Sequence, residues 1–419
     1  GLVGSEMCIR DSLFVTELIP LAITATAGAI SCGLLGFIPA KQVFSGLSDS
    51  TVVLFAGMFV VGASMFYTGL AQKIGGVVVK MCGTGENSLM FGLMMVGTVL
   101  SSCLSNTGTA ACLLPVALGI CAAAKIPASR QLMPLAFACG WGGIITMVGT
   151  PPNIIAVGAM TSAGLEPFGF FEFAWIGIPV SIAGMLYMMF VGKYLLPKVD
   201  LSADQEIEQE IEAASTSSTK QIISGVILAL VIITMAVGIP GVSLEIAAIT
   251  GALVCVLTGC LTEKQAYASI DWVTIFLFAG MMPVSNAMDK TGAGKLIAEW
   301  AVSLMGGSPT PIIMTSVLFI ISCTLTQFMS NTAAAALLAP VGVAISQQLG
   351  ASPKAVLMAI GVAASCAFAT PVGTPPCTLV LGPGGYKFMD YVKVGVPLVI
   401  LCFIVSIIVI PMVWPFFPG

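Results

Sequence analysis

The sequence lacks histidine and carries few charges. None of its 419 residues is histidine, and Asp, Glu, Lys and Arg together make up only 8% of them. Without histidine, the commonest zinc ligand and the usual proton-shuttling side chain are both missing. A soluble domain carries about a quarter charged residues, so this composition excludes an ordinary water-soluble fold. The formal net charge of −4 is small, and no basic patch suggests a nucleic-acid partner.

The 13 cysteines include no Cys-x-x-Cys pair. Most of them lie within apolar runs, as Cys112, Cys121 and Cys139 do, where cysteine behaves as a small buried hydrophobic residue. The sequence therefore predicts neither a disulfide framework nor a transition-metal site. It also arranges no nucleophile with a base, so we expect no enzymatic activity and no organic cofactor.

Long hydrophobic runs are what the sequence has instead. It is 58% hydrophobic, with a mean hydropathy of +1.06, and runs of about 20 residues, long enough to cross a bilayer, recur throughout. We predict an all-α polytopic membrane protein with the lipid bilayer as its surroundings. Two apolar segments, 88–124 and 309–348, are interrupted in the middle by polar residues. The predicted crossings are 13–38, 51–69, 131–165, 172–195, 220–238, 242–260, 272–289, 355–384 and 392–415.

Two segments do not fit the pattern of crossings. Leu2–Ser12 reads LVGSEMCIRDS, which resembles the in-frame translation of a sequencing-library adaptor, and such segments are excluded from fold reasoning. We therefore expect residues 1–12 to be adaptor-derived and the first crossings of the protein to be missing. Residues 198–219 are acidic and rich in Ser and Thr, which predicts a linker between two halves.

The chain repeats itself. LFAGM at residues 54–58, SNTGTAACLLPVALGI at 105–120 and GTPP at 149–152 return, in the same or closely similar form, after 223, 225 and 224 residues. Matching blocks in one order at nearly one offset indicate an internal duplication. Five predicted crossings separate the two interrupted segments, and an odd number inverts equivalent elements across the membrane. Inverted repeats with broken helices are a common plan of secondary transporters.

The positive charges predict the orientation. With the 198–219 linker in the cytoplasm, most lysines and arginines lie inside, as the positive-inside rule favours. The residues left outside are Lys41, Lys290, Lys295 and Lys354. We predict a multi-pass protein of the plasma or inner membrane with its C-terminus outside.

Each interrupted segment has two apolar arms joined by Ser-Asn-Thr, at 105–107 and at 330–332. Arms of this length fit a re-entrant hairpin better than two full crossings. Ser, Asn and Thr favour the N-cap, so the second arm begins there, and its free N–H groups suit an anion. The first arm ends at the same tip with free carbonyl groups, which suit a cation. One helical turn before each tip lies a hydroxyl, Ser101 or Thr326.

Gly-Thr-Pro-Pro interrupts the crossings at 131–165 and 355–384. Proline removes a backbone donor and breaks the helix, and unwound backbone at membrane depth is tolerated only where it lines a cavity or packs within protein. Two hairpin tips and two broken helices can therefore surround one central site. One such motif alone would be ordinary packing or a kink, but four at matched offsets favour a functional site. The helix-breaking residues are Pro151, Pro152, Pro375 and Pro376.

These motifs resemble those of the divalent anion:sodium symporter family, within the wider group of citrate-transporter-like permeases. The resemblance is carried by the two Ser-Asn-Thr triplets, by GTPPN at 149–153 and by GTPPC at 373–377, and it covers the chain from residue 13. One departure is Cys377, where the family often has a second asparagine. The resemblance implies a homodimer in which a transport domain moves like an elevator against a scaffold.

The resemblance also implies how the chain is divided and which residues bind ligands. The scaffold parts would be residues 13–82 and 220–306, and the transport parts 83–197 and 307–419. The first sodium site would use Ser101, Ser105, Asn106 and the Gly149 backbone. The second would use Thr326, the Met329 backbone, Asn331 and the Gly373 backbone. The substrate would meet Asn106, Thr107, Asn331, Thr332, Thr374 and Pro375.

The sequence predicts a secondary active transporter with Na⁺ as coupling ion and a small divalent anion, such as succinate, malate or citrate, as substrate. A sulfate or other oxyanion permease of the same superfamily, an anion exchanger and a proton-coupled carrier remain open alternatives. A proton-coupled carrier usually needs an intramembrane carboxylate or histidine, and the central motifs contain neither.

Overall fold

The computed structural model confirms the all-α class. Its described residues form helices joined by turns, without a strand among them. Five described helices are long and apolar enough to cross a membrane, or six if the bent pair Glu263–Ser269 and Trp272–Val284 is one span. The expected adaptor segment 1–12 and most of the 198–219 linker lie outside the described residues. The structure describes residues 20–82, 85–199, 218–237, 239, 241–292, 296, 299, 303 and 309–417.

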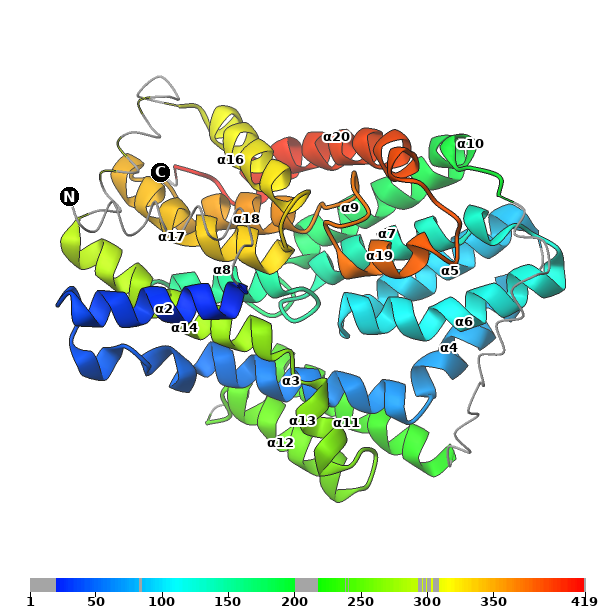
Figure 1. Cartoon of the computed structure of the whole chain (residues 1–419), viewed down its shortest axis with the longest axis horizontal. Helices are drawn as coiled ribbons and strands as arrows, with labels where there is room; N and C mark the ends of the chain where they lie inside the picture. Colours follow the sequence, from blue (N-terminus) through cyan, green and yellow to red (C-terminus); the bar gives the residue numbers. More distant parts are fainter. Residues whose placement is uncertain are drawn as a thin grey trace.

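One group of helices pairs the two halves of the chain crosswise. α3 (Ser50–Tyr67) packs along α12 (Leu244–Leu257), and α14 (Trp272–Thr291), the equivalent of α3, packs along α2 (Leu21–Leu34). These helices lie together in the lower part of Figure 1, with α11 (Ser218–Val237) beside them. The duplication seen in the sequence is therefore present in the packing.

Glycine makes both crosswise contacts possible. A Cβ atom on Gly57 of α3 would lie 2.7 Å from the carbonyl carbon of Ala248 in α12. A Cβ atom on Gly280, the equivalent residue of α14, would lie 2.7 Å from the carbonyl carbon of Ala25 in α2. Backbones can approach this closely only where one partner has no side chain.

The two interrupted segments are helical hairpins, as predicted. α5 (Glu86–Ser101) and α6 (Asn106–Ala124) form the first hairpin, and α16 (Pro311–Thr326) and α17 (Asn331–Leu349) form the second. In each hairpin the first helix ends at a hydroxyl residue and the second begins at the asparagine of Ser-Asn-Thr. In Figure 1 the first hairpin lies at the right and the second at the upper left.

The Gly-Thr-Pro-Pro crossings are broken helices, also as predicted. α7 (Leu132–Gly142) is separated from α8 (Pro151–Ser162) by irregular backbone, and α18 (Pro353–Ala364) is separated in the same way from α19 (Pro375–Leu381). The second segment of each broken helix has proline at its first two positions, where proline is tolerated because those N–H groups lack a helical partner.

Among the described residues, two α-helices lie outside the segments predicted from the sequence. α4 (Leu70–Cys82) is amphipathic and too short for a crossing, so a search for long apolar runs passes over it. α13 (Glu263–Ser269) begins with a capping box between Thr262 and Gln265, a local signal that the sequence does carry. The remaining helices, α9 (Ala174–Tyr187), α10 (Lys193–Leu195) and α20 (Phe388–Val413), fall within the predicted crossings or overlap them.

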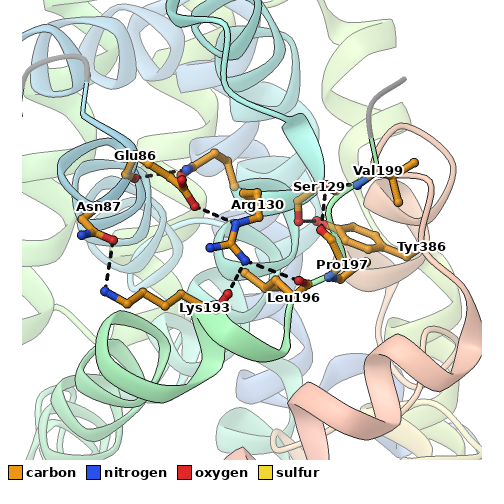
Figure 2. Close-up of polar contacts among 10 residues, drawn as sticks. Glu86, Asn87, Ser129, Arg130, Lys193, Leu196, Pro197, Val199 and Tyr386 are labelled. Carbon is orange, nitrogen blue, oxygen red and sulfur yellow. Dashed lines mark hydrogen bonds and ion pairs between the residues drawn. The ribbon is translucent and has the colours of Figure 1, made fainter. Parts of the chain in front are cut away.

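Arg130 ties together the elements around the base of the first hairpin (Figure 2). Its Nε donates to Glu86 Oε1 at 2.6 Å, and its guanidinium also donates to the carbonyl groups of Lys193 and Leu196. The start of α5, the turn before α7 and the end of α10 are therefore held at one point, next to where the 198–219 linker begins.

Tyr386 extends this junction to the turn before α20. Its hydroxyl donates to the Ser129 carbonyl at 2.7 Å and accepts from the Met133 N–H at 2.8 Å. Burial raises the pKa of the Tyr386 hydroxyl above its ordinary value, so the group stays protonated and keeps its hydrogen to donate. Both halves of the chain thus meet at the junction drawn in Figure 2.

Candidate functional site

The site is built on the tips of the two hairpins. Ser105 and Ser330 are the N-caps of α6 and α17, and each side chain accepts at 3.1 Å from the N–H three residues later, of Gly108 and Ala333. The N–H groups of the Asn-Thr pair after each cap have no earlier carbonyl in the helix to bond. Each tip therefore presents N–H groups and the positive end of a helix dipole.

Asn106 lies at the centre of a cluster of oxygen atoms in the first half. The end of its amide is 2.6 Å from Ser101 Oγ, 3.0 Å from the Cys139 carbonyl oxygen and 3.1 Å from the Gly149 carbonyl oxygen. Ser101 Oγ donates to the Cys139 carbonyl at 2.7 Å. The cluster joins the end of α5, the start of α6, the last turn of α7 and the irregular backbone before α8.

Asn331 has the same surroundings in the second half. The end of its amide is 2.7 Å from Thr326 Oγ1, 3.2 Å from the Ala364 carbonyl oxygen and 3.0 Å from the Gly373 carbonyl oxygen. Thr326 Oγ1 donates to the Ala364 carbonyl at 2.6 Å. Each of these four residues lies 224 or 225 positions after its counterpart in the first half, so the two clusters are equivalent.

The chemistry of these clusters depends on how each amide is turned. Asn106 and Asn331 face only oxygen atoms, so a nitrogen placed there lies within hydrogen-bond distance of three acceptors and can donate its two hydrogens among them. If the amide oxygen is placed there instead, four oxygen atoms come together in each cluster: the hydroxyl, the amide oxygen and two carbonyl oxygens. The hydroxyl of Ser101 or Thr326 has only one hydrogen, so it cannot satisfy all of the other three oxygens. Converging carbonyl, amide and hydroxyl oxygens are the ligand set of a hard cation. The donor set therefore fits a hard cation such as sodium.

Both tips and both broken helices line a single cavity of about 940 Å³. Ser101 and Thr326 are fully buried directly behind this lining. Pro152 and Pro376 are buried one position further into α8 and α19. From the first half the lining includes Ser105, Asn106, Thr107, Gly149, Thr150 and Pro151. From the second half it includes Met329, Asn331, Thr332, Gly373, Thr374 and Pro375.

The structure thus brings all the predicted ligand residues together, and it adds others. Thr150 lines the cavity beside Pro151, as Thr374 does beside Pro375, so the duplication alone could have identified it. Thr150 Oγ1 is buried without a hydrogen-bond partner among the described residues. The carbonyl groups of Cys139 and Ala364 were missed because a backbone oxygen has no sequence signature.

The lining of the cavity extends to the end of α3 that lies near the start of α11. It reaches Tyr67 and Gln72, where α3 meets α4, and Asp271 at the start of α14. The neighbouring Lys73 Nζ donates to Gln221 Oε1 at 3.2 Å, at the start of α11. Asp271 is the one charged side chain that the described residues add to the lining, and it accepts from the first-turn N–H groups of α14.

The chain is similar to transporters from several organisms. An uncharacterized transporter of Haemophilus influenzae is 31% identical over 416 residues, which cover 94% of this chain and 87% of that protein. The sodium-dependent dicarboxylate transporter SdcS of Staphylococcus aureus is 25% identical over 440 residues, which cover 97% of this chain and 84% of SdcS.

Two solved structures share the fold. The YdaH transporter of Alcanivorax borkumensis superimposes with a TM-score of 0.66 at 16% identity, over 91% of this chain and 87% of its own. MtrF of Neisseria gonorrhoeae, from a class of antimetabolite efflux pumps, has the same TM-score and identity over 93% of this chain and 86% of its own. At these identities the two structures support the fold alone.

The family itself is shown by sequence. The family model described as citrate transporter matches residues 12–350 and 236–417, and so covers nearly all of the chain. The predicted resemblance to citrate-transporter-like permeases is confirmed, and with it a transporter and not an enzyme. This chain is a polytopic membrane transporter that belongs to the citrate transporter family.

Proposed function

We propose that this protein is a sodium-coupled symporter of a small di- or tricarboxylate. The observation that carries the proposal is the pair of equivalent oxygen clusters around Asn106 and Asn331, beside one cavity lined by free helix N-termini. The similarity to a sodium-dependent dicarboxylate transporter supports the same ion and the same class of substrate.

The two cation sites would be the two oxygen clusters. Each offers a hydroxyl, an amide oxygen and two carbonyl oxygens, and Gly149 and Gly373 supply carbonyls from unwound backbone. Unwound carbonyls and the C-terminal ends of half-helices are typical sodium ligands in transporters built from inverted repeats. The hydroxyl of Ser105 is engaged in capping α6, so its contribution, like that of Met329, would come from backbone oxygen.

The anion would bind at the starts of α6 and α17. Their free N–H groups and the hydroxyls of Thr107 and Thr332 would donate hydrogen bonds to the anion from both halves of the chain. The starts of α8 and α19 contribute differently, because Pro151 and Pro375 have no N–H, so these helices add dipole and the hydroxyl of Thr374.

Sodium completes the charge balance of the anion site. Burying an unpaired carboxylate costs several kcal/mol or more, and helix ends carry only partial charges. The described residues of the lining contain neither lysine nor arginine. Asn106 and Asn331 would each lie between a cation and the anion. Sodium would therefore bind first and raise the affinity for the anion, and linkage requires the reverse effect too.

Transport would follow from the inverted repeats. The hairpins and broken helices would move as one body against the group that contains α2, α3, α12 and α14, carrying the site across the membrane. With the linker in the cytoplasm, the part of the lining at Tyr67 and Asp271 would face the cytoplasm. The arrangement described here would then be the inward-open state.

Uptake by purified protein in proteoliposomes tests this function. We expect an inward sodium gradient to drive accumulation of labelled succinate or citrate, and choline in place of sodium to abolish it. Accumulation of sulfate alone would point to an oxyanion permease. Accumulation driven by a proton gradient in the absence of sodium would point to a proton-coupled carrier, and either result would overturn the proposal.

A further inference from the structure

The irregular backbone before α8 is held in place by one buried side chain. Asn153 is fully buried, and its Nδ2 donates to the carbonyl oxygens of Thr146 at 2.8 Å and of Ile144 at 3.2 Å. Backbone that leaves a helix within a membrane protein needs such partners because no water is available to supply them. Asn153 therefore fixes the segment that ends in Gly149, whose carbonyl faces Asn106.

The second half cannot use the same device. The residue 224 positions after Asn153 is Cys377, which is also fully buried. A thiol is a weak donor with a single hydrogen, so it cannot replace the two strong N–H donors of an amide. The segment between α18 and α19 therefore needs its support from another residue.

Gln327 supplies that support from the hairpin and not from the broken helix itself. It lies at the tip of the second hairpin and is largely buried. Its Nε2 donates to the Cys366 carbonyl at 3.0 Å, and its Oε1 accepts from the Ala369 N–H at 2.9 Å. One amide side chain thus bonds both a donor and an acceptor of the irregular segment.

The bonds of Gln327 continue to the cation cluster. Its own carbonyl accepts from Thr370 Oγ1 at 2.7 Å, and Thr370 Oγ1 accepts from the Gly373 N–H at 3.1 Å. The Gly373 carbonyl in turn lies 3.0 Å from the amide of Asn331. A hydrogen-bonded path therefore runs from the backbone carbonyl of Gln327 to a proposed sodium ligand, while the Gln327 side chain holds the residues just before Thr370.

The equivalent residue of the first half does not do this. It is Ser102, 225 positions earlier, and its hydroxyl donates to Val99 O in its own helix at 2.8 Å. The bond from the following threonine is common to both halves, since Thr146 Oγ1 donates to the Ser102 carbonyl. What differs is the amide, which comes from α8 in the first half and from the hairpin tip in the second.

We propose that Gln327 is the positioning residue of the second cation site, replacing the amide that Cys377 cannot provide. This inference rests on the proposed sodium coupling. Gln327 is not among the residues that line the cavity; it orients the carbonyl of Gly373. Partners of metal ligands typically change metal affinity by about 10- to 100-fold when they are removed. The two sites therefore have the same ligands but different supports, and each support can be removed separately.

The test compares sodium activation of uptake in four proteins: wild type, Gln327→Met, Cys377→Asn, and the double variant. Methionine keeps the size of the side chain and removes its hydrogen bonds. We expect Gln327→Met to raise the sodium concentration for half-maximal uptake at least about tenfold, with little change in the anion KM at saturating sodium. An asparagine at 377 should restore most of the sodium affinity in the double variant, as Asn153 does for the first site.

The matched control is Ser102→Ala at the equivalent position, which should leave sodium activation within about twofold of wild type because its hydroxyl bonds only to nearby residues of the chain, Val99 and Cys103. If Gln327→Met does not fold, Gln327→Asn, which keeps the amide but shortens its reach, gives the same comparison with and without Cys377→Asn. If the wild type requires sodium, either of two results would refute the role of Gln327. One is unchanged sodium activation in the Gln327 variants, and the other is the absence of rescue by Cys377→Asn. A wild type that is indifferent to sodium would instead refute the proposed function and this inference with it.

Discussion

The ring of Phe278 lies directly on Gly158, so that a Cβ atom on the glycine would come within 2.1 Å of the ring. Phe278 belongs to α14 and Gly158 to α8, so this contact joins the two groups of helices that would move against each other. The ring is buried and also packs edge to face on Phe55, with centroids 6.0 Å apart. A side chain at position 158 would therefore require this ring to shift.

The duplication gives this contact a counterpart. Phe55 lies 223 residues before Phe278, and Gly382 lies 224 residues after Gly158. A Cβ atom on Gly382 would meet nothing within 4 Å. If inverted repeats exchange roles during transport, Phe55 should rest on Gly382 in the outward-open state.

The first prediction is that Gly158→Ala disfavours the arrangement described here, whereas Gly382→Ala favours it. Overpacking a buried contact costs about 1–3 kcal/mol, enough to change a two-state population by about 5- to 150-fold. Cys103 lines the cavity, so its labelling by a maleimide from the linker side measures access. We expect slower labelling in Gly158→Ala and faster labelling in Gly382→Ala, with Cys103→Ser as the background. Equal rates in the two variants would exclude this exchange of contacts.

The second prediction concerns the two asparagines. Asn106→Ala and Asn331→Ala should each weaken both sodium and anion binding by about 10- to 100-fold, because a hydrogen bond to a charged group contributes about 1.5–3 kcal/mol and 1.4 kcal/mol is tenfold. Isothermal calorimetry in detergent measures both affinities. Asn87→Ala is the control, since Asn87 accepts only a long 3.4 Å bond from Lys193 at the surface. If a variant lost anion binding but kept normal sodium binding, the asparagine would not be a ligand of the cation, and the prediction would be wrong.

The third prediction concerns Gly143, which packs against Asn106 in the first oxygen cluster. A Cβ atom on Gly143 would lie 2.4 Å from Asn106 Oδ1 and 3.0 Å from the Gly149 carbonyl oxygen. Gly143→Ala should therefore displace ligands of the first cation site and raise the sodium requirement at least about tenfold. Gly119→Ala is matched to it, because its Cβ atom would meet nothing within 4 Å and alanine favours the helix. Similar sodium activation in the two variants would contradict the proposed first site.

The features predicted correctly from the sequence are those with local causes. Ser105 and Ser330 cap the helices they were expected to cap, because an N-cap depends on the next three residues. The breaks at Gly149 and Gly373 follow from the prolines beside them. The duplication then placed the tips and the breaks around one centre, since equivalent elements of inverted repeats meet at their shared axis.

The features that escaped prediction depend on three-dimensional neighbours. The carbonyl groups of Cys139 and Ala364 belong to helices that reach the clusters only in the folded chain. Gln327 looks like an isolated polar residue in the sequence, and its partners lie 39 and 42 positions away. The offset between repeats also conceals it, because its equivalent Ser102 has a different role. A comparison of the two halves identifies the motifs that they share. It does not identify a residue such as Gln327, which is present in one half alone and replaces an interaction made differently in the other.

The last prediction concerns the junction of Figure 2, which should contribute to stability and not to selectivity. Arg130 is largely buried and satisfies two carbonyl groups as well as Glu86. Arg130→Ala leaves those acceptors without a donor, at a cost of about 1–3 kcal/mol for each unsatisfied group. We expect a lower midpoint of thermal unfolding in detergent, with an unchanged anion KM for the protein that remains folded.

The conservative variant of the same residue makes this prediction specific. Arg130→Lys keeps the charge but replaces a planar fork of five donors by a single ammonium. If the charge pair with Glu86 were what stabilises the junction, lysine would restore most of the midpoint. The side chain of Glu86 is 40% exposed, and such a pair contributes at most about 1 kcal/mol. We therefore expect Arg130→Lys to recover only a small part of the loss, because the bonds to the carbonyl groups of Lys193 and Leu196 need the fork.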